Sequence, residues 1–563
     1  MFKLSALCLA TLVLLQLPSC YADTLPAAAA ADQATVDQAL AARIDAGIAR
    51  YYKPADPGAT VIVTKDGHTV FRKAYGMADV AHRMAMTPDT VLRLGSITKQ
   101  FTSTAIMMLA DEGKLSVADD ITKFLPDYPT HGKKITIEHL LTHTSGIVSY
   151  TSKREFFASM TKDMSVAQMI DFFKNDKLEF EPGAQWRYNN SGYFLLGAII
   201  EKVSGMPYAK FVEQRIFVPL GMTNTAYEGY ERAVAPRSSG HTGGSGGFKP
   251  SMPLSMSQPY AAGSLVSTVD DLARWDVAVS SGKLLKAASW QKAFTAHTLD
   301  GGASTKYGYG WMLGTVQGAP TIGHGGSING YKTFALRVPS ESLYVAVLSN
   351  SDSGLVMPEM VANKVAAIAI GKPYPEFSEI KLAPAALAAF AGVYKVDDKV
   401  SRTIRLEEGK LVMERTGRGS VALVPFSDNG LFIPDTLEYM EFGRDASGAV
   451  TQVTYHQGET VSVHARSGLV AERQVINVPA AVLDTYLGRY QLSPDLVIDV
   501  TRKGERLFGQ ASGQPPLEMF AMTETLFFTR EINAQVRFNK DAGGAVQLQL
   551  SHDGSNMIGK KIK

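Results

Sequence analysis

Short runs of apolar residues stand at both ends of the first two thirds of the chain, and helix-like patterns lie between them. The segments "GATVIVTKDG" and "HTVFRKAYG" predict two strands, with Asp66-Gly67 as the hairpin turn that joins them. The later segments "YGYGWML", "PTIGHGG", "KTFALRVP" and "LYVAVLSN" also predict strands. Between these groups, apolar residues recur at helical spacing in residues 100–112, 136–141, 165–173 and 191–203. This order predicts one α/β (α+β) domain whose sheet joins the two ends of the segment.

One further helix is expected at "STVDDLARW", where Ser267 and Asp270 have the spacing of a capping box. The Pro-punctuated stretch "GKPYPEF" reads as a linker that closes this first domain. The domain is therefore expected to span residues 23–373.

Beyond the linker the chain changes to short strands and turns, and it contains an internal repeat. "FAGVY" at 390–394 matches "YLGRY" at 486–490, and "DASGAVTQVTYHQG" matches "DAGGAVQLQLSHDG" farther on. The repeat predicts two tandem all-β units, over residues 384–466 and 480–560, each a small barrel or curved sheet. His456 and His552 occupy equivalent positions of the repeat and read as turn histidines after a strand.

The N-terminus resembles a secretory signal peptide. A basic start, Met1-Phe2-Lys3, precedes an apolar run too short for a convincing membrane span, and cleavage after Ala22 fits the small-residue rule. Residues 1–22 are therefore expected to direct export, to the periplasm or out of the cell. "LPSC" offers an alternative, in which Cys20 carries a lipid anchor. No later segment is long and apolar enough to cross a bilayer.

The amino-acid composition excludes several classes of function and of catalytic site. Apolar residues make up 45% of the chain and charged residues 20%, as in globular proteins, and the net charge of +2 provides no basic footprint for nucleic acid. The only cysteines, Cys8 and Cys20, lie in the leader, which excludes a disulfide, a cysteine nucleophile and a cysteine zinc site in the mature chain. His139 and His143 stand one helical turn apart without an evident third ligand, so they are expected to be structural. No metal or cofactor is predicted.

The segment "RLGSITKQFTSTAIMMLADEG" places Ser96 three residues before Lys99. That spacing alone is weak, because the chain holds four other Ser-x-x-Lys sequences. Context singles out this one, since Ser96 follows a predicted strand and Gly95 and begins a helix that ends at Gly113. Three residues of helix put both side chains on one face, and the helix dipole and burial would lower the pKa of the lysine toward that of a usable base.

Two other motifs and one decoy complete the set of candidates. Tyr188-Asn189-Asn190 lies in a turn just before a helix, and His324-Gly325-Gly326 lies on a predicted strand whose glycines allow close approach of a substrate. The segment 243–247 matches Gly-x-Ser-x-Gly, but it sits in a glycine-rich stretch with no strand before it or helix after it. It is expected to be a mobile loop near the cleft, not a nucleophile elbow.

These motifs, in this order, resemble those of the class C β-lactamase-like group of penicillin-recognising serine hydrolases. The phrases "LLTHTSGI", "PGAQWRYNNSGY" and "AAGSLVSTVDDLARW" carry the resemblance further, over residues 43–370. It implies a β-lactamase/transpeptidase-like fold, an antiparallel sheet flanked by helices. It also implies the following roles: Ser96 as the nucleophile, Lys99 as its proton acceptor, Tyr188 as the acid/base partner, Asn190 as a group that orients Lys99 and substrate, His324 and Gly326 as substrate-binding residues, and the backbone N–H groups of Ser96 and Ser327 as the oxyanion hole.

The chain departs from the β-lactamase pattern at His324, which stands where those enzymes carry the lysine of Lys-Thr-Gly. A histidine is only partly charged near neutral pH, so a permanent cation for a substrate carboxylate is missing. This favours the D-aminopeptidase and esterase branches. The expected function is an exported serine hydrolase acting through an acyl-enzyme on ester, amide or β-lactam bonds.

Two alternatives remain open. The same cleft could serve a catalytically slow protein that binds penicillin or peptidoglycan peptides, or the β units could bind a polymer or partner. The expected partners are a small-molecule or peptide substrate and peptidoglycan fragments, and no nucleic acid.

Overall fold

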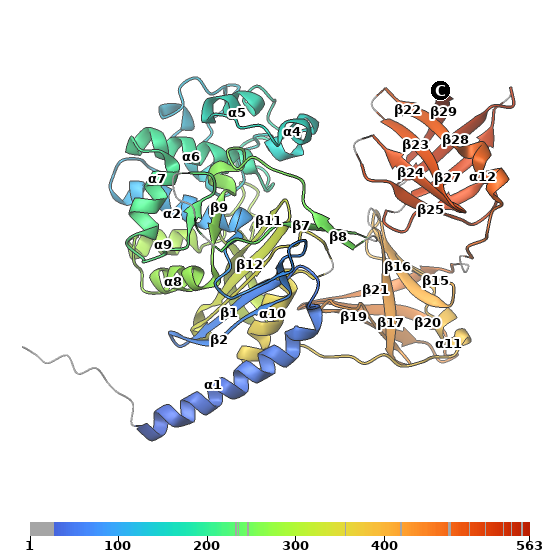
Figure 1. Cartoon of the computed structure of the whole chain (residues 1–563), viewed down its shortest axis with the longest axis horizontal. Coiled ribbons are helices and arrows are strands. Elements are labelled where there is room, and N and C mark those ends of the chain that lie inside the picture. The colour runs from blue at the N-terminus through green and yellow to red at the C-terminus, as the bar shows by residue number, and fades with distance from the viewer. Residues whose placement is uncertain are drawn as a thin grey trace, which may run out of the picture.

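The computed structural model of the chain describes residues 27–230, 234, 236–244, 247–354, 356–416, 419–470, 474–494, 496–512, 514–532, 534–541, 543–552 and 555–562. The expected signal peptide 1–22, its cleavage position after Ala22 and the candidate lipid site Cys20 lie outside these residues. Within them, a first domain of helices and one large sheet is followed by two barrels, one above the other in Figure 1.

The large sheet joins the two ends of the first domain, as the strand pattern predicted. All neighbouring strands are antiparallel, and β1 (Ala59–Lys65) pairs on one side with β2 (His68–Tyr75) and on the other with β13 (Leu343–Ser349). Their order across the sheet is β10-β11-β12-β13-β1-β2. The remaining strands are β10 (Met312–Val316), β11 (Ala319–Ile328) and β12 (Tyr331–Val338). The hairpin turn lies at Asp66-Gly67, where both residues have positive φ.

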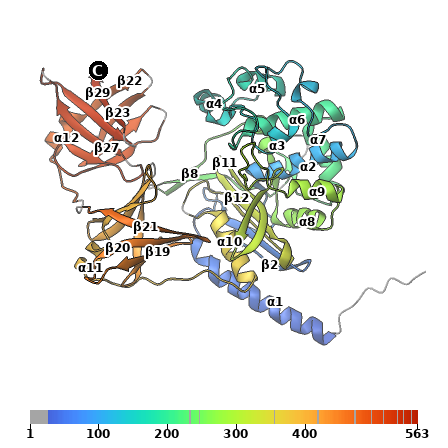
Figure 2. The ribbon, with the colours of Figure 1, turned by 180° about the vertical axis from the view of Figure 1, so that it is seen from behind.

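Helices cover both faces of this sheet, so its central strands are apolar on both sides. On β1, Val61 and Val63 belong to one hydrophobic core, whereas Ile62 between them belongs to another. The first core includes α1 (Ala27–Ile48) and α10 (Pro358–Ala369), which lie side by side in Figure 1 and Figure 2. The second core includes the helical region that carries most of the candidate residues.

The helical region follows the sequence pattern closely. The four expected helices are observed as α2 (Thr98–Asp111), α3 (Ile137–Leu141), α5 (Val166–Phe173) and α6 (Asn190–Ser204). Thr136 and Ser165 cap the second and third of these with complete capping boxes. The region also contains α4 (Arg154–Ser159), α7 (Tyr208–Val212) and α9 (Ala287–Ala293), and the short strands β3 (Met77–Asp79), β4 (Met84–Ala85), β5 (Leu92–Arg93), β6 (Ala226–Tyr227) and β9 (Leu265–Ser267).

The start of α8 (Val269–Ser280) differs from the expected capping box by one residue. Thr268, not Ser267, is the N-cap, and its hydroxyl accepts a hydrogen bond from the Asp271 backbone N–H. Ser267 instead ends β9, because strand pairing extends to that residue. Asp270 therefore has no capping partner in Ser267 and is available for a contact with the sheet.

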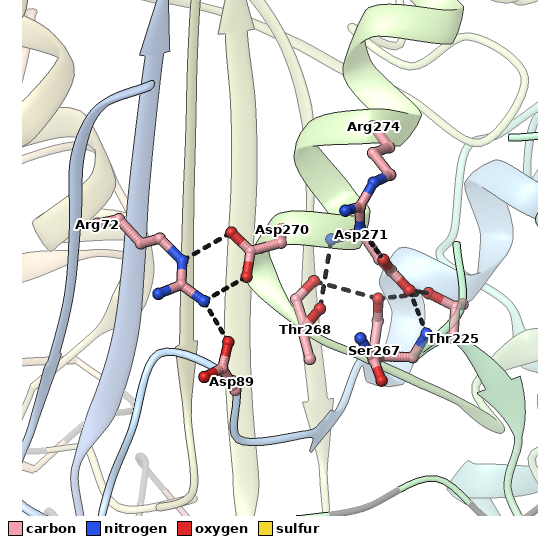
Figure 3. Close-up of polar contacts among 9 residues, drawn as sticks. Arg72, Asp89, Thr225, Ser267, Thr268, Asp270, Asp271 and Arg274 are labelled. Atoms are coloured by element: carbon pink, nitrogen blue, oxygen red, sulfur yellow. Dashed lines mark hydrogen bonds and ion pairs between the residues drawn. The ribbon is translucent and has the colours of Figure 1, made fainter. Parts of the chain in front are cut away.

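Two aspartates fasten the N-terminus of α8 to its surroundings, as Figure 3 shows. Arg72 of β2 donates two hydrogen bonds to the carboxylate of Asp270, at 2.7 and 2.8 Å, and a third to Asp89. The Asp271 carboxylate is fully buried and accepts a hydrogen bond of 2.8 Å from the Thr225 hydroxyl. Both acidic residues also lie where the helix dipole favours negative charge.

Each of the two repeat units forms a closed eight-stranded barrel, which confirms the prediction of two small all-β units. In both barrels neighbouring strands in the sequence are neighbours in space, and the last strand closes onto the first. The first comprises α11 (Pro384–Ala388), β14 (Gly392–Lys395), β15 (Ser401–Glu407), β16 (Lys410–Arg415), β17 (Ser420–Ser427), β18 (Gly430–Phe432), β19 (Glu438–Arg444), β20 (Val450–Gln457) and β21 (Thr460–Gly468). The second comprises α12 (Ala480–Tyr486), β22 (Gly488–Ser493), β23 (Leu496–Lys503), β24 (Arg506–Ala511), β25 (Leu517–Ala521), β26 (Leu526–Phe528), β27 (Ala534–Lys540), β28 (Val546–His552) and β29 (Ser555–Ile562).

The two repeat histidines are not structural equivalents, contrary to the sequence expectation. In the first barrel Glu438 pairs with Gln457, whereas in the second the corresponding Ala534 pairs with His552. The β19–β20 ladder contains a register shift that the β27–β28 ladder lacks, so one extra residue precedes His456. The counterpart of His552 is therefore Gln457, and both histidines lie within strands, not in turns.

The glycine-rich segment 243–247 forms part of a hairpin, β7 (His241–Gly244) and β8 (Gly247–Pro250). Residues 245 and 246, which include the serine of the formal Gly-x-Ser-x-Gly match, lie outside the described residues. No helix follows β8 directly, so the surroundings are not those of a nucleophile elbow. Among the helices that the structure describes, none is both long enough and apolar enough to cross a membrane.

Candidate active site

Ser96 and Lys99 lie where β5 turns into α2. The chain makes one tight 3-10 turn over Gly95–Ile97 before the helix starts. Gly95 has a φ of +54°, and a Cβ there would lie 3.0 Å from the Ser327 backbone nitrogen. This close approach requires glycine and brings the start of α2 against β11. The Ser96 side chain consequently opens into a cleft beside that strand.

Lys99 is fully buried, and its Nζ has three oxygen neighbours. They are Ser96 Oγ at 3.0 Å, Asn190 Oδ1 at 2.8 Å and the Ala262 carbonyl at 2.9 Å. A neutral amine has two protons and one lone pair. Its two N–H bonds suit the amide and carbonyl oxygens, which accept only, and the lone pair is left for the Ser96 hydroxyl.

Burial lowers the pKa of Lys99 well below its ordinary value. Among the described residues no carboxylate contacts the amine, and the groups above it are the rings of Tyr188 and Tyr193, 4.8 and 5.4 Å from Nζ. A buried amine without a counter-ion loses its proton most readily. The neutral form is the one that can accept a proton from Ser96.

Tyr188 faces the same pair from the turn before α6. Its hydroxyl is buried, and none of the described residues completes a hydrogen bond to it. Burial raises the pKa of this phenol, and the nearby Ser96 hydroxyl offsets only part of that rise. Tyr188 is therefore a protonated phenol whose O–H is available to a bound molecule.

Asn189 and Asn190 of the segment Tyr188-Asn189-Asn190 have different roles, the first in capping a helix and the second at the site. Asn189 is the N-cap of α6, accepting a hydrogen bond of 2.7 Å from the Gly192 backbone N–H. Asn190 reaches the site, and while its Oδ1 accepts from Lys99 its Nδ2 donates to the Thr151 hydroxyl at 3.1 Å. That second bond fixes which end of the amide faces the amine. Thr151 was not predicted from the sequence, because it lies in a short 3-10 turn, Tyr150–Ser152, that carries no motif.

His324 lines the cleft, but both of its ring nitrogens are engaged. Nε2 lies 2.9 Å from the Tyr307 hydroxyl, and Nδ1 lies 2.6 Å from the Gly325 carbonyl. Burial, aided by the proximity of Lys99, lowers the pKa of the imidazole to about 3. The expectation of a partly charged histidine is therefore corrected, since this ring is neutral at any pH near 7.

Gly326 allows β11 to pass close to the turn that carries Ser96. A Cβ at this position would lie 2.0 Å from the Leu94 carbonyl oxygen and 2.3 Å from Thr333 Oγ1. Only glycine permits such a separation. The next residue, Ser327, lines the cleft together with Ser96, which places both predicted oxyanion-hole residues on the same space.

The cleft has a volume of about 430 Å³ and contains two charged residues that were not anticipated. Lys332 of β12 pairs directly with Ser327, and burial lowers the pKa of its amine. Glu359 lies in the first turn of α10, and burial raises the pKa of its carboxyl. The Asn329-Gly330 turn could have revealed Lys332, because a two-residue hairpin loop sets Ser327 opposite it. No local pattern marks Glu359.

His139 and His143 have structural roles, as expected. His139 completes the capping box of α3 by accepting from the Thr136 backbone N–H. His143 is buried, accepts a hydrogen bond of 3.1 Å from the Asn189 backbone N–H and packs 4.4 Å from the ring of Tyr188. It therefore holds the Tyr-x-Asn turn in place. Among the described residues, no group of His, Cys, Asp and Glu is arranged to hold a metal ion.

Comparisons with known proteins confirm the family and the fold. The profile of the Beta-lactamase family matches residues 36–369, and a profile described as a domain of unknown function (DUF3471) matches residues 472–560. A penicillin-binding protein of Bacillus subtilis (strain 168) is 28% identical over 71% of this chain and 93% of its own length. A D-aminopeptidase of Gluconobacter oxydans (strain 621H) is 28% identical over 61% of this chain and 65% of its own length.

A solved structure agrees with these matches. The octameric penicillin-binding protein homologue from Pyrococcus abyssi superimposes with a TM-score of 0.55 at 27% identity, over 76% of this chain and 98% of that one. The catalytic-type domain with its antiparallel sheet and flanking helices thus has the β-lactamase/transpeptidase-like fold. The chain belongs to the Beta-lactamase family, whose members are serine hydrolases.

Proposed function

We propose that this serine hydrolase works through an acyl-enzyme on Ser96, with Lys99 as the base, and that it is exported. The observation that carries the proposal is the buried Lys99 amine, 3.0 Å from Ser96 Oγ and without a carboxylate partner in the part of the chain that the structure describes. An amine kept neutral by burial can accept the serine proton, which an ordinary surface lysine cannot do near pH 7.

In the acylation step, Ser96 Oγ attacks the substrate carbonyl while its proton passes to Lys99 Nζ. The resulting oxyanion accepts hydrogen bonds from the backbone N–H groups of Ser96 and Ser327, an interaction typically worth about 3 kcal/mol. When the bond to the leaving group breaks, that group takes the proton of Tyr188. The tyrosine regains a proton from the Lys99 ammonium, so the acyl-enzyme starts its second half with a neutral amine.

Deacylation follows the same path in reverse. Water attacks the acyl carbonyl and gives up a proton to the base, and the Ser96–acyl bond breaks as Ser96 regains its proton. The raised pKa of Tyr188 supports the role of proton donor, because the phenol stays protonated between turnovers. Asn190 keeps Lys99 in position in both halves.

For the substrate, we propose an ester or amide of a D-amino acid. The D-aminopeptidase among the relatives supports this class, and so does Glu359, whose carboxyl can pair with a free amino group in the cleft. Lys332, across from Ser327, offers a cation for a substrate carboxylate that His324 does not provide. β-Lactams and peptidoglycan peptides, which also carry a carboxylate, therefore remain candidate substrates.

Covalent labelling tests the mechanism. Purified protein is treated with a fluorophosphonate and with a fluorescent penicillin, and the labelled peptide is identified by mass spectrometry. Labelling at Ser96 in the wild type and its loss in Ser96→Ala are expected. Ser159→Ala is the matched control, because Ser159 has the same spacing to a lysine but bonds to the Glu155 carbonyl of its own helix. Wild-type protein that takes up neither reagent would contradict the acyl-enzyme.

The second candidate, a slow penicillin-binding protein, is supported by the penicillin-binding relatives. It predicts a stable penicilloyl adduct without turnover, whereas the hydrolase releases product continuously. D-alanyl anilides, nitrophenyl esters and a chromogenic cephalosporin distinguish the two and select the substrate class. Lys332→Met should raise KM for carboxylate-bearing substrates only, and Glu359→Gln for those with a free amino group.

Export is tested by the N-terminus of the mature protein. Signal-peptide cleavage predicts a chain that begins at Asp23, whereas lipidation predicts a modified Cys20 as the first residue. A chain recovered from the producing cells with residues 1–22 intact would contradict both.

A further inference from the structure

The second barrel contains an apolar cavity of about 420 Å³ that is partly open to solvent. It lies between the strands, at the end of the barrel where β24 leads into β25 and β26 leads into β27. Its walls are mostly apolar, and its lining includes Ile498, Leu517, Met519, Val536 and Leu550. This is the size of cavity that takes a small organic ligand, and an eight-stranded barrel has room for one.

In the first barrel, a polar network occupies the equivalent positions. The guanidinium of Arg402 stacks on the ring of Tyr455, 3.8 Å from its centroid, and lies 2.8 Å from His464 Nε2. The Tyr455 hydroxyl in turn donates to Glu438. Arg402, Tyr455 and His464 are all buried, so long side chains fill this end of the barrel.

Strand register shows what replaced this network in the second barrel. Tyr394 pairs with Arg402, and the corresponding Tyr490 pairs with Ile498. Leu550 takes the place of Tyr455, because Tyr455 pairs with Met440 and Leu550 with the corresponding Val536. Ala534 takes the place of Glu438, which pairs with Gln457 as Ala534 does with His552. Gly559 takes the place of His464, because His464 pairs with Val453 and Gly559 with the corresponding Leu548. Every member of the polar network has become aliphatic or has lost its side chain.

A second set of exchanges enlarges the space. Gly509 stands where the first barrel has Met413, and Ala511 stands where it has Arg415. A Cβ built on Gly509 would point at Met519 Sδ, 3.2 Å away, which places the missing side chain inside the barrel. The φ of Gly509 is not positive, so backbone strain does not require glycine here. Gly509 and Ala511 therefore leave space in the barrel interior, and the backbone conformation of β24 does not explain Gly509.

The two ends of the second barrel differ. At one end the core is closed by aromatic packing, where the Tyr486 ring stacks on Phe538 at 4.2 Å and Phe527 meets Phe538 edge-on at 5.6 Å. At the cavity end the lining includes Gln514 and His552, and Ile532 is 38% exposed. The Thr529 hydroxyl, also in the lining, already donates to the Ile532 carbonyl. The cavity thus has an aliphatic body and polar groups confined to its end.

We propose that the second barrel binds the alkyl chain of an amphiphile, with the chain in the cavity and the polar end beside Gln514 and His552. A cavity whose walls are mostly apolar favours an apolar guest, because the guest restores dispersion contacts that its walls lack. The site is separate from the cleft at Ser96, and it does not depend on the function proposed for that cleft.

Fluorescent probe binding tests the proposal on the full chain. N-phenyl-1-naphthylamine is added to untreated protein and, in parallel, to protein whose Ser96 has been phosphonylated with a small fluorophosphonate, so that binding in the cleft at Ser96 can be told apart from binding in the barrel. Saturable fluorescence at one site per chain is expected, with displacement by dodecanol or dodecanoic acid. The two competitors differ only in the polar end. The ratio of their inhibition constants therefore reports on the groups at the polar end of the cavity.

Variants locate the site. Gly509→Met restores the residue of the first barrel and should weaken probe binding about tenfold or more, because its side chain occupies the cavity. Thr501→Met is the matched control, since Thr501 is exposed on the outside of β23. Ala511→Leu fills the same space from another position and serves if Gly509→Met loses the β-sheet circular dichroism signal of the wild type. Absence of saturable binding to the wild type, or equal binding by a folded cavity-filling variant, would overturn the proposal.

Discussion

Replacing Lys99 with methionine tests the central feature of the site, a buried amine whose pKa is lowered by desolvation. The methionine keeps most of the volume and the apolar stem but removes the titratable group. We expect two results that share one cause. Acylation should fall by about 10²- to 10⁴-fold, the usual contribution of a general base. The stability difference between variant and wild type should also depend on pH.

The magnitude follows from proton linkage. In the unfolded chain Lys99 binds a proton below its ordinary pKa of 10.5, whereas in the folded chain it does so only below a lower pKa. Between these two values unfolding takes up one proton, so the wild-type free energy of unfolding falls by about 1.4 kcal/mol for each pH unit of acidification. The Lys99→Met variant has no such group. The free energy of unfolding of the variant, relative to that of the wild type, should therefore rise by that amount for each pH unit as pH falls. The difference should become constant below the pKa of Lys99 in the folded chain.

Tryptophan fluorescence provides the assay. All four tryptophans, Trp186, Trp275, Trp290 and Trp311, lie in the catalytic domain, so urea unfolding followed at this signal reports on that domain and not on the barrels. The acidic limb of the pH profile of acylation should have its midpoint at the pH where the stability difference levels off. Lys162→Met, at an exposed lysine with the same Ser-x-x-Lys spacing, controls for the substitution itself.

A stability difference that is constant from pH 10 to pH 6 would refute the reasoning. Lys99 would then keep an ordinary pKa, and its contacts with Asn190 Oδ1 and the Ala262 carbonyl would be those of an ammonium. A charged Lys99 could orient Ser96 but could not accept its proton, and another group would have to be the base.

Three further results are expected. Asn190→Ala should reduce acylation about tenfold to a hundredfold with little change in KM for neutral esters, because Lys99 loses the oxygen that orients it, and single-turnover kinetics measure this. Gly326→Ala should abolish labelling at Ser96 or unfold the domain, since its Cβ would meet the Leu94 carbonyl oxygen at 2.0 Å; full labelling of a folded variant would contradict the close approach. Asp271→Ala should destabilise the catalytic domain by about 3 kcal/mol, because the Asn224 backbone N–H and the Thr225 hydroxyl lose a buried acceptor and Arg274 loses its ion-pair partner; a loss under 1 kcal/mol by urea unfolding would contradict that role.

Much of the fold was predictable because its elements follow local rules. The Asp66-Gly67 hairpin, the helices expected at 136–141 and 165–173 and the two tandem repeats all come from short-range patterns, and the structure confirms them. Two sequence predictions were wrong, each because of a shift of one residue. The N-cap of α8 moved by one residue to Thr268, since β9 extends through Ser267, and one inserted residue in β20 displaced His456 from His552.

Some residues of the candidate site were predicted from the sequence, and others were found only in the structure. Sequence spacing and helix position singled out Ser96 and Lys99, and the order of the motifs added Tyr188, Asn190 and the strand at His324. The structure brings these side chains to one cleft, but their catalytic roles remain predictions. Lys332 could have been found from hairpin register, whereas Glu359 comes from a helix far along the chain and had no signal.

The sequence by itself determined which residues can do the chemistry and which segments form helices, hairpins and repeats, because those depend on neighbours within a few positions. Only the tertiary structure decided the electrostatic states. Lys99 is a candidate base because distant segments remove water from it, and the same burial makes His324 neutral. The cavity of the second barrel arises in the same way, since Gly509 and Ala511 define a space only when eight strands close around it. Desolvation and enclosed volume are properties of the whole packing, and no local pattern contains them.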